Sequence, residues 1–144
     1  MNQIKEIIDF EDFSKTDIRI GTIIEVINFE KARKPAYQIT IDFGSLGVKK
    51  SSAQITTLYS KGELVGKQVC AVINFKPLQI ADFKSECLIL GIQNGKDVVL
   101  LKASEKTLKT ESKSHKYKYY ENIYTISITY NFKLQCSKRN YSKE

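Results

Sequence analysis

The chain has 144 residues, about one domain's worth, and its hydrophobic fraction of 42% is near the norm for a protein with a buried core. The 23 Lys and Arg outnumber the 16 Asp and Glu, giving a net charge of +7 that hints at phosphate-bearing partners. No apolar run approaches about 18 residues, so a membrane-spanning helix is excluded. The start, MNQIKEIIDFEDF, carries acids within its apolar stretch and lacks the pattern of a signal peptide.

The residue inventory argues against catalysis and bound cofactors. His115 is the only histidine, and Cys70, Cys87 and Cys136 form no close pair, so a zinc site is not expected. A catalytic triad would have to recruit His115 from a Lys/Tyr-rich stretch, and no Gly-rich phosphate loop is present. We expect no catalytic residue, no metal and no organic cofactor, in a cytoplasmic binding protein with reduced cysteines.

The composition changes near residue 104. All 7 Gly and both Pro lie before residue 96, whereas six of the 8 Tyr lie after residue 116. Residues 1–104 carry 14 basic and 12 acidic residues, a net of +2, and residues 105–144 carry 9 and 4, a net of +5. We therefore predict a folded domain over 1–104 and an atypical basic, Tyr/Lys-rich extension over 105–144. Disorder and a basic, aromatic RNA-binding extension are two interpretations of the latter.

The first part of the chain predicts one helix and three strands. Ile4–Phe13 spaces its apolar residues as an amphipathic helix does. Asp17–Phe29 is rich in β-branched residues, and Gly21 within it indicates a bulge or a sharp bend. Ala36–Phe43 alternates cleanly between apolar and polar residues, and Val48–Ile55 has the pattern of a polar strand.

The remaining elements complete an all-β pattern. A short helix is predicted within Thr57–Leu64, followed by two apolar strands, Val69–Phe75 and Cys87–Ile92. Asn94-Gly95 indicates a hairpin that leads into a last strand over Val98–Leu101. Five strands with a short helix between the third and fourth is the order of an OB-fold, a five-stranded Greek-key barrel. A plain β-sandwich is the alternative.

Several motifs resemble those of a known family. ARKPAY, KKSSAQIT and NFKPLQIADFKSE follow, in order, the pattern of the CsaA family of bacterial tRNA-binding-domain proteins, and the similarity runs from about Phe10 to Leu101. The resemblance implies an OB-fold homodimer that binds tRNA by structure rather than by sequence. CsaA-like proteins are also described as chaperones linked to protein export, so binding of unfolded or export-destined polypeptides is the alternative function.

The residues and the resemblance together predict an RNA-binding surface. Cations neutralise phosphates, and hydroxyls bond phosphate or ribose oxygens. The polar strand and the loop after the first strand carry such groups, although a solvated edge would also explain them. The resemblance implies tRNA contacts at Ser85 and at the apolar Leu88. The alternative is that Leu88 belongs to the core. The predicted RNA-binding residues are Arg33, Lys34, Lys49, Lys50, Ser51, Ser52, Gln54, Lys76, Ser85 and Leu88.

Three further expectations concern packing. Arg19 beside Asp17 is more typical of a local ion pair than of an RNA contact. Phe75 and Phe83 are expected in the core rather than stacked on bases. We do not expect one small barrel to bury all the apolar side chains near the N-terminus, and together with the resemblance this predicts a homodimer. The predicted dimer residues are Ile4, Ile7, Ile8 and Phe10.

Overall fold

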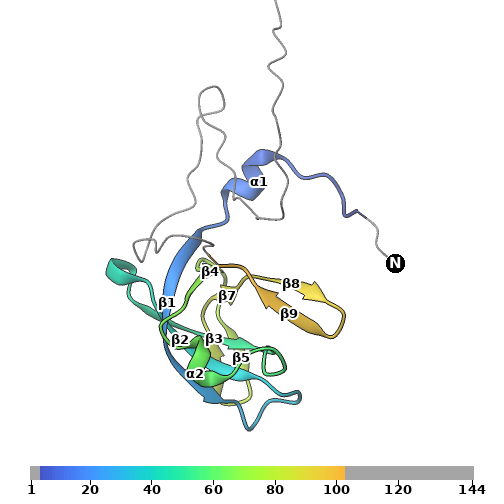
Figure 1. Cartoon of the computed structure of the whole chain (residues 1–144). Coiled ribbons are helices and arrows are strands. Elements are labelled where there is room, and N and C mark those ends of the chain that lie inside the picture. The colour runs from blue at the N-terminus through green and yellow to red at the C-terminus, as the bar shows by residue number, and fades with distance from the viewer. Residues whose placement is uncertain (1–3, 103–144) are drawn as a thin grey trace, which may run out of the picture.

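Five strands form one antiparallel sheet in the computed structural model, which describes residues 4–102 (Figure 1). The predicted extension over 105–144 lies outside the described residues. The sheet has the strand order β3-β2-β1-β4-β7, so the longest strand, β1, is central. The strands are β1 (Ile18–Asn28), β2 (Tyr37–Asp42), β3 (Val48–Ala53), β4 (Gln68–Val72) and β7 (Leu88–Ile89).

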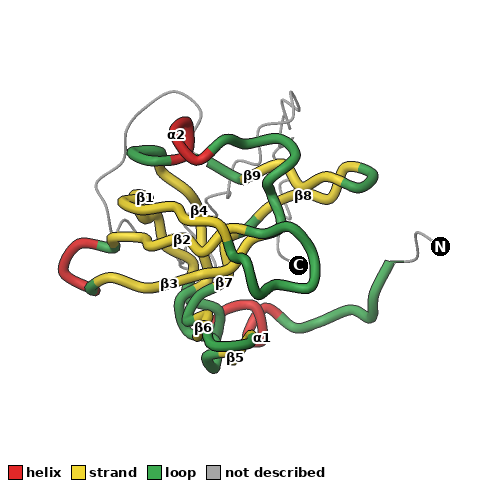
Figure 2. Tube along the Cα trace, turned by 90° about the horizontal axis from the view of Figure 1, so that it is seen from below, coloured by secondary structure: helices red, strands yellow, loops and turns green. Residues whose placement is uncertain are grey.

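The two edges of this sheet meet between β3 and residues 85–87. The backbone N–H of Glu86 donates to the carbonyl of Lys50 at 2.7 Å, and the Ser51 hydroxyl donates to the carbonyl of Cys87 at 2.9 Å. The sheet therefore curls into a nearly closed barrel, which Figure 2 shows from below. The predicted OB-fold is confirmed, and a sandwich of two separate sheets is excluded.

The interior of the barrel follows the alternation of the strands. Ile39 and Ile41 of β2 and Phe43 after it are fully buried, while the residues between them face outward. Ile23 of β1 completes this layer. Inward residues at every second position supply the apolar burial that stabilises a domain of this size.

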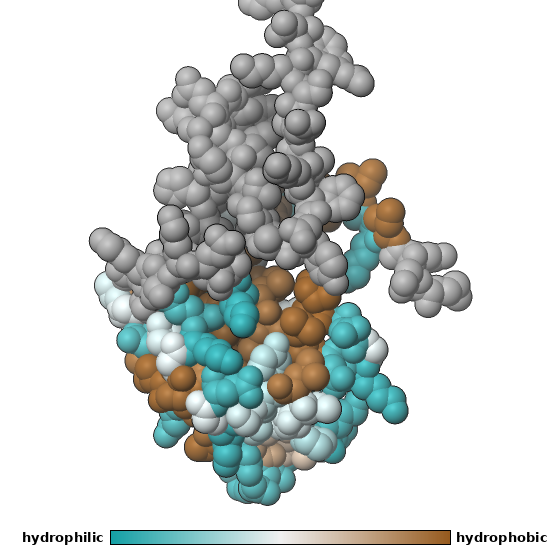
Figure 3. All heavy atoms as spheres, viewed as in Figure 1, coloured by the Kyte–Doolittle hydropathy of each residue, from teal (hydrophilic) through white to brown (hydrophobic). Residues whose placement is uncertain are grey.

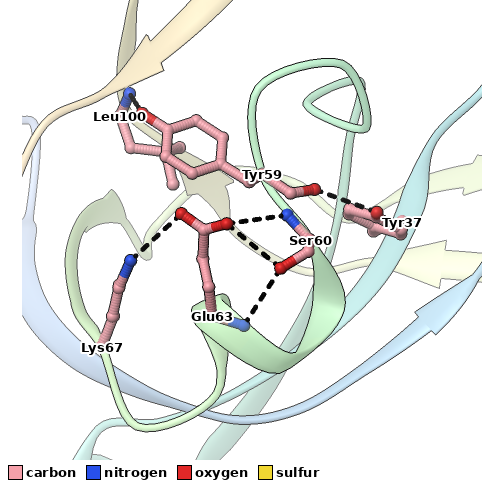
Figure 4. A network of polar contacts seen from close by, with 6 residues as sticks. All are labelled: Tyr37, Tyr59, Ser60, Glu63, Lys67 and Leu100. Atoms are coloured by element: carbon pink, nitrogen blue, oxygen red, sulfur yellow. Dashed lines mark hydrogen bonds and ion pairs between the residues drawn. The ribbon is translucent and has the colours of Figure 1, made fainter.

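One end of the barrel is plugged by a short helix, α2 (Lys61–Leu64), within the predicted range. Leu64 is fully buried in the core. Ser60 and Glu63 form a reciprocal capping box, and Lys67 donates to Glu63 (Figure 4). Hydrogen bonds to Ser60 and the nearby Lys67 ammonium lower the pKa of Glu63. Because the helix has a single turn, the cap and the buried leucine hold it rather than helix propensity.

Tyr59 ties this end of the barrel to the last strand. Its hydroxyl accepts a hydrogen bond from the backbone N–H of Leu100, and its carbonyl accepts one from the hydroxyl of Tyr37 (Figure 4). These two bonds link the segment before α2 to β2 and to β9 (Asp97–Leu100).

Smaller elements surround the barrel. The 3-10 helix η1 (Gly44–Leu46) joins β2 to β3, and β5 (Leu78–Ile80) pairs with β6 (Phe83–Ser85). The predicted hairpin is confirmed, because β8 (Gly91–Asn94) pairs with β9 across a turn at Gly95, whose φ is +61°. No helix within residues 4–102 is long and apolar enough to cross a membrane.

Two predicted elements are corrected. The N-terminal helix α1 covers only Phe10–Ser14, and residues 4–9 are not helical, because their exposed apolar side chains bury little surface against the described part of the chain. The expected strand Cys87–Ile92 is two strands, since β7 pairs with β4 and β8 pairs with β9. The chain changes partner at Leu90, whose N–H donates to the carbonyl of Cys70.

Gly21 has a packing role rather than a bulge. The register of β1 against β2 shifts between Ile23 and Glu25, so the bulge lies beyond Gly21. A Cβ at Gly21 would lie 2.5 Å from Ile41 Cγ2 and 2.6 Å from an atom of the Phe43 ring. At this point β1 passes from pairing with β4 to pairing with β2. Because Gly21 has no side chain, Ile41 and Phe43 can pack directly against the backbone of β1.

Gly21→Ala is expected to lower the free energy of unfolding by about 1–3 kcal/mol, because the added methyl overpacks the core. Gly62→Ala in α2 is the matched control, since a Cβ there meets nothing within 4 Å. That substitution is expected to be neutral or stabilising by up to about 1 kcal/mol. Urea unfolding followed by circular dichroism measures both, and equal stabilities for the two variants would contradict the packing role.

Candidate nucleic-acid interface

The edge where the barrel closes brings three separate segments of the chain together. β6 lies beside β3, and the Ser52 N–H donates to the Ser85 hydroxyl at 3.3 Å. The β5–β6 hairpin in turn packs against the loop that joins β1 to β2. We call residues 29–36, 48–54 and 82–88 together the closing face.

The β1–β2 loop is anchored on the hairpin by two different contacts. The rings of Phe29 and Phe83 lie 5.4 Å apart between centroids, in a small apolar cluster with Ala36. Lys31 forms an ion pair with Asp82 at the tip of the hairpin, and this contact lowers the pKa of Asp82. A tilted ring pair and a charge pair together hold the loop in one position.

Positive charge is concentrated on the closing face. Its three segments contain six Lys and Arg and three Asp and Glu, a net of +3. Residues 4–102 as a whole contain 14 and 12, a net of +2. The rest of the described chain therefore carries a net charge of −1. The small net charge of residues 4–102 is the sum of a basic closing face and a slightly acidic remainder.

The predicted loop cations are available for a ligand. Arg33 and Lys34 are exposed, and neither forms an ion pair with any residue between 4 and 102. Their neighbour Lys31 was not predicted as a site residue. Its ammonium forms an ion pair with Asp82, so its charge is already partnered within the protein.

Lys49 and Lys50 point to opposite sides of β3. Lys50 is exposed and pairs in register with Thr40, whose hydroxyl donates to Glu25, so it lies on the outer face of the sheet. Lys49 pairs with the fully buried Ile41, and is itself half-buried. Because neighbouring strand residues alternate, the two lysines cannot present one doubly charged surface.

Ser51 is placed inside the barrel, which corrects its expected role as an RNA ligand. The side chain is 1% exposed, and its hydroxyl closes the barrel through Cys87. Ser52 is half-buried on the opposite face, and Gln54 is exposed just beyond β3. Ser85 bridges the seam by accepting from Ser52 and donating to the Cys87 carbonyl at 3.4 Å.

The other two predicted residues, Leu88 and Lys76, are both exposed. Leu88 pairs with Val72 of β4 and is 49% exposed, so the alternative that it belongs to the core is wrong. Lys76 is exposed in the segment between Asn74 and Leu78. Asn74 accepts from the N–H of Asp17 and donates to the carbonyl of Lys15, which places this segment beside the N-terminal part of the chain.

The packing expectations had mixed outcomes. Arg19 forms the expected ion pair with Asp17, with Nε 2.7 Å from Oδ1. Phe83 is buried as predicted, but Phe75 is 53% exposed, so its assignment to the core is wrong. β4 ends at Val72, three residues before Phe75, and the chain then leaves the barrel.

Lys84 is a surface cation that the sequence reasoning missed. It is exposed on β6, next to Ser85 and opposite Gln79 in the hairpin. The signal was present in the DFKSE motif, since residues that alternate with the buried Phe83 must face outward.

Of the cysteines in the described chain, Cys70 is half-buried and Cys87 is buried. Burial raises the pKa of the Cys87 thiol to about 11, and burial also raises that of Cys70. Neither thiol is therefore activated as a nucleophile. Within residues 4–102, no group of three or more His, Cys, Asp and Glu side chains is arranged to hold a metal ion.

The chain is similar in sequence and in fold to proteins of one known family. Residues 18–112 match the family described as "Putative tRNA binding domain". The chaperone CsaA of Bacillus anthracis is 47% identical, with a TM-score of 0.71 over 75% of this chain and 98% of that one. The CsaA chaperone protein of Picrophilus torridus is 48% identical, with a TM-score of 0.70 over 74% of this chain and 98% of that one.

Curated relatives place the same domain within larger enzymes. The methionine–tRNA ligase of Parabacteroides distasonis is 38% identical over 109 residues, which are 76% of this chain but only 16% of the ligase. The chain thus spans about one sixth of that relative's length. The fold and the matches define the class as an OB-fold tRNA-binding domain. Within that class, the chain belongs to the CsaA family.

Ser51→Ala is expected to lower the free energy of unfolding by about 1 kcal/mol, because the closing hydrogen bond to Cys87 is lost. Ser52→Ala is the matched control: its bond at the seam uses the backbone N–H, so its stability is expected to change by less than about 0.5 kcal/mol. Denaturant unfolding of both variants measures this. A fully stable Ser51→Ala variant that bound tRNA poorly would instead mark the hydroxyl as a ligand.

Proposed function

We propose that the chain binds tRNA on the closing face, as a binding module without catalytic turnover. The observation that carries the proposal is the concentration of positive charge there, with Arg33 and Lys34 on a loop packed against the hairpin and without an ion pair to any residue in 4–102. Membership of a family described by tRNA binding supports the same ligand. A tRNA ligand implies a cytoplasmic protein.

Recognition is proposed to depend on phosphate positions rather than on base sequence. Lys50 and Lys84 are exposed on neighbouring strands, β3 and β6. Arg33 and Lys34 lie on the β1–β2 loop, which packs against the hairpin that contains β6. Cations spread over several elements can contact several phosphates of a folded RNA, which is read mainly by shape. The acids Glu86 and Glu30 on the same face disfavour indiscriminate binding of polyanions.

Lys50→Ala combined with Lys84→Ala is expected to weaken tRNA binding and to lower the slope of log affinity against log salt by about two, one for each lost phosphate contact. Lys61→Ala with Lys96→Ala removes the same charge from α2 and from the β8–β9 turn, away from the closing face. Filter binding at several salt concentrations measures both. Equal slopes for the two double variants would show that only total charge matters.

We further propose that two copies associate through the N-terminal segment. Ile4 and Ile7 are each 98% exposed, and Ile8 and Phe10 are more than half exposed. Figure 3 shows further apolar surface where the β8–β9 hairpin joins the barrel, and Ile92 and Val99 pair in register there. Apolar side chains so fully exposed favour burial against a second copy.

Light scattering on the full chain at micromolar concentration is expected to give twice the 16.5 kDa chain mass. Ile7→Asp is expected to shift the population toward monomer without changing the barrel's unfolding, because this side chain touches little of its own domain. Leu46→Asp in η1 is a matched control and is expected to leave the dimer intact. A monomeric wild-type chain would refute the association.

The exposed apolar side chains also favour a second candidate function, the binding of unfolded or export-destined polypeptides. Leu88, Ile92 and Val99 are each more than 40% exposed on strands near the end of the described chain. The two CsaA relatives are named chaperones. Competition between labelled tRNA and an unfolded, positively charged protein separates the functions, because only a shared surface would make the two ligands exclusive.

A further inference from the structure

A pocket of about 420 Å³ is lined by the β1–β2 loop, the residues that flank it and Thr56. Its apolar lining comes from the exposed Pro35, the half-buried Ala32 and the buried Phe29 and Ala36, and Arg33 and Lys34 also line it. We propose that this pocket receives a single unpaired nucleotide of RNA, with the base over the apolar lining and the phosphate at the two cations. The inference rests on the proposed function and adds to it a defined subsite.

The pocket is built before any ligand arrives. The Phe29 N–H donates to the Ala36 carbonyl at 3.0 Å, which closes the base of the loop, and the Ala32 N–H donates to the Phe29 carbonyl at 3.1 Å. The Phe29–Phe83 ring contact and the Lys31–Asp82 ion pair then hold the loop on the hairpin. A ligand therefore has little loop ordering to pay for.

The two cations that line the pocket are suited to a phosphate. Arg33 and Lys34 have no acidic partner among residues 4–102, whereas Lys31 in the same loop is neutralised by Asp82. A guanidinium and an ammonium on adjacent residues supply both a planar donor pair and a point charge, and charge-assisted hydrogen bonds to phosphate are the strong ones.

The remaining lining favours a nucleotide over a bare anion or an acidic peptide. Asn28 and Thr56 contribute an amide and a hydroxyl that form no side-chain hydrogen bond within the described chain. Glu30 adds a carboxylate, which repels a second anion but accepts from a ribose hydroxyl or a base amino group. The volume lies within the range of about 300–1,000 Å³ typical of small-molecule sites.

The first test is a titration of the ¹⁵N-labelled full chain with AMP, followed by amide chemical shifts. Shifts are expected at residues 28–37 and at Thr56, and Arg33→Ala is expected to weaken AMP binding about tenfold. Ribose 5-phosphate and inorganic phosphate are expected to bind more weakly. If either matches AMP, the site takes phosphate alone, and if an acidic peptide produces the larger shifts, the site is a peptide site. Both results overturn the proposal.

The second test fills the pocket. Thr56→Tyr places a ring in it, whereas Thr57→Tyr alters an exposed neighbour outside the lining. Thr56→Tyr is expected to abolish the AMP shifts, to weaken tRNA binding several-fold and to lower the salt slope by about one, because the phosphate contact at Arg33 and Lys34 is lost, while Thr57→Tyr behaves as wild type. Thermal unfolding verifies that both variants fold.

The outcomes separate this subsite from the proposed function. If wild type binds tRNA but Thr56→Tyr and Thr57→Tyr bind it equally well, the nucleotide subsite is overturned and tRNA binding by the closing face stands. If wild type binds AMP at the loop but no tRNA, the proposed function fails, and so does a subsite for RNA.

Discussion

The barrel closes where the hydroxyl of Ser51 donates to the carbonyl of Cys87, alongside the backbone bond from Glu86 to Lys50. Few bonds join this edge, whereas full ladders join β1 to β2 and β2 to β3. If the strands separated at this edge while the barrel stayed folded, the buried Ser51 hydroxyl would lose its partner, which is costly in the interior. The closing edge is therefore expected to form together with the rest of the barrel. Through this edge, residues 82–88 come to lie beside β3, and the hairpin comes to lie beneath the β1–β2 loop.

That arrangement explains how a chain with little net charge on its barrel can present a basic face. The described residues have a net of +2, but the three segments joined at the closing edge hold a net of +3. Electrostatic attraction between a protein and RNA depends on local potential, which falls off within about 10 Å at ordinary salt. A bulk-charge comparison between parts of the sequence therefore says little about where a polyanion binds.

The same structure divides its cations by role. Lys31 forms an exposed ion pair with Asp82, and Lys67 forms one with Glu63. Arg33 and Lys34 have no such partner within the described chain. The domain matches 98% of the chain of a CsaA chaperone but only 16% of a methionine–tRNA ligase.

Local patterns in the sequence determined much of the fold. Alternation in Ala36–Phe43, the capping residues Ser60 and Glu63, and the glycine at 95 each specify structure within a few residues, and the strands, the helix and the hairpin formed where these signals lie. The order of these elements was sufficient for the OB-fold, because few topologies place one short helix between the third and fourth of five strands.

Only the tertiary structure decided which surface each residue occupies. Lys49 and Lys50 are the same residue type, and the alternation along a strand predicts only that they face opposite sides. The pairing of Lys49 with the buried Ile41 shows that Lys49 is the one that faces inward. Ser51 looks like a ligand until the barrel closes over it, and Leu88 looks like core until β7 pairs at the sheet's edge. The β1–β2 loop, which lines the pocket, packs on Phe83, 54 positions beyond Phe29 in the chain. Contacts so distant in sequence leave no local pattern, because their energy is realised only when the whole barrel has formed.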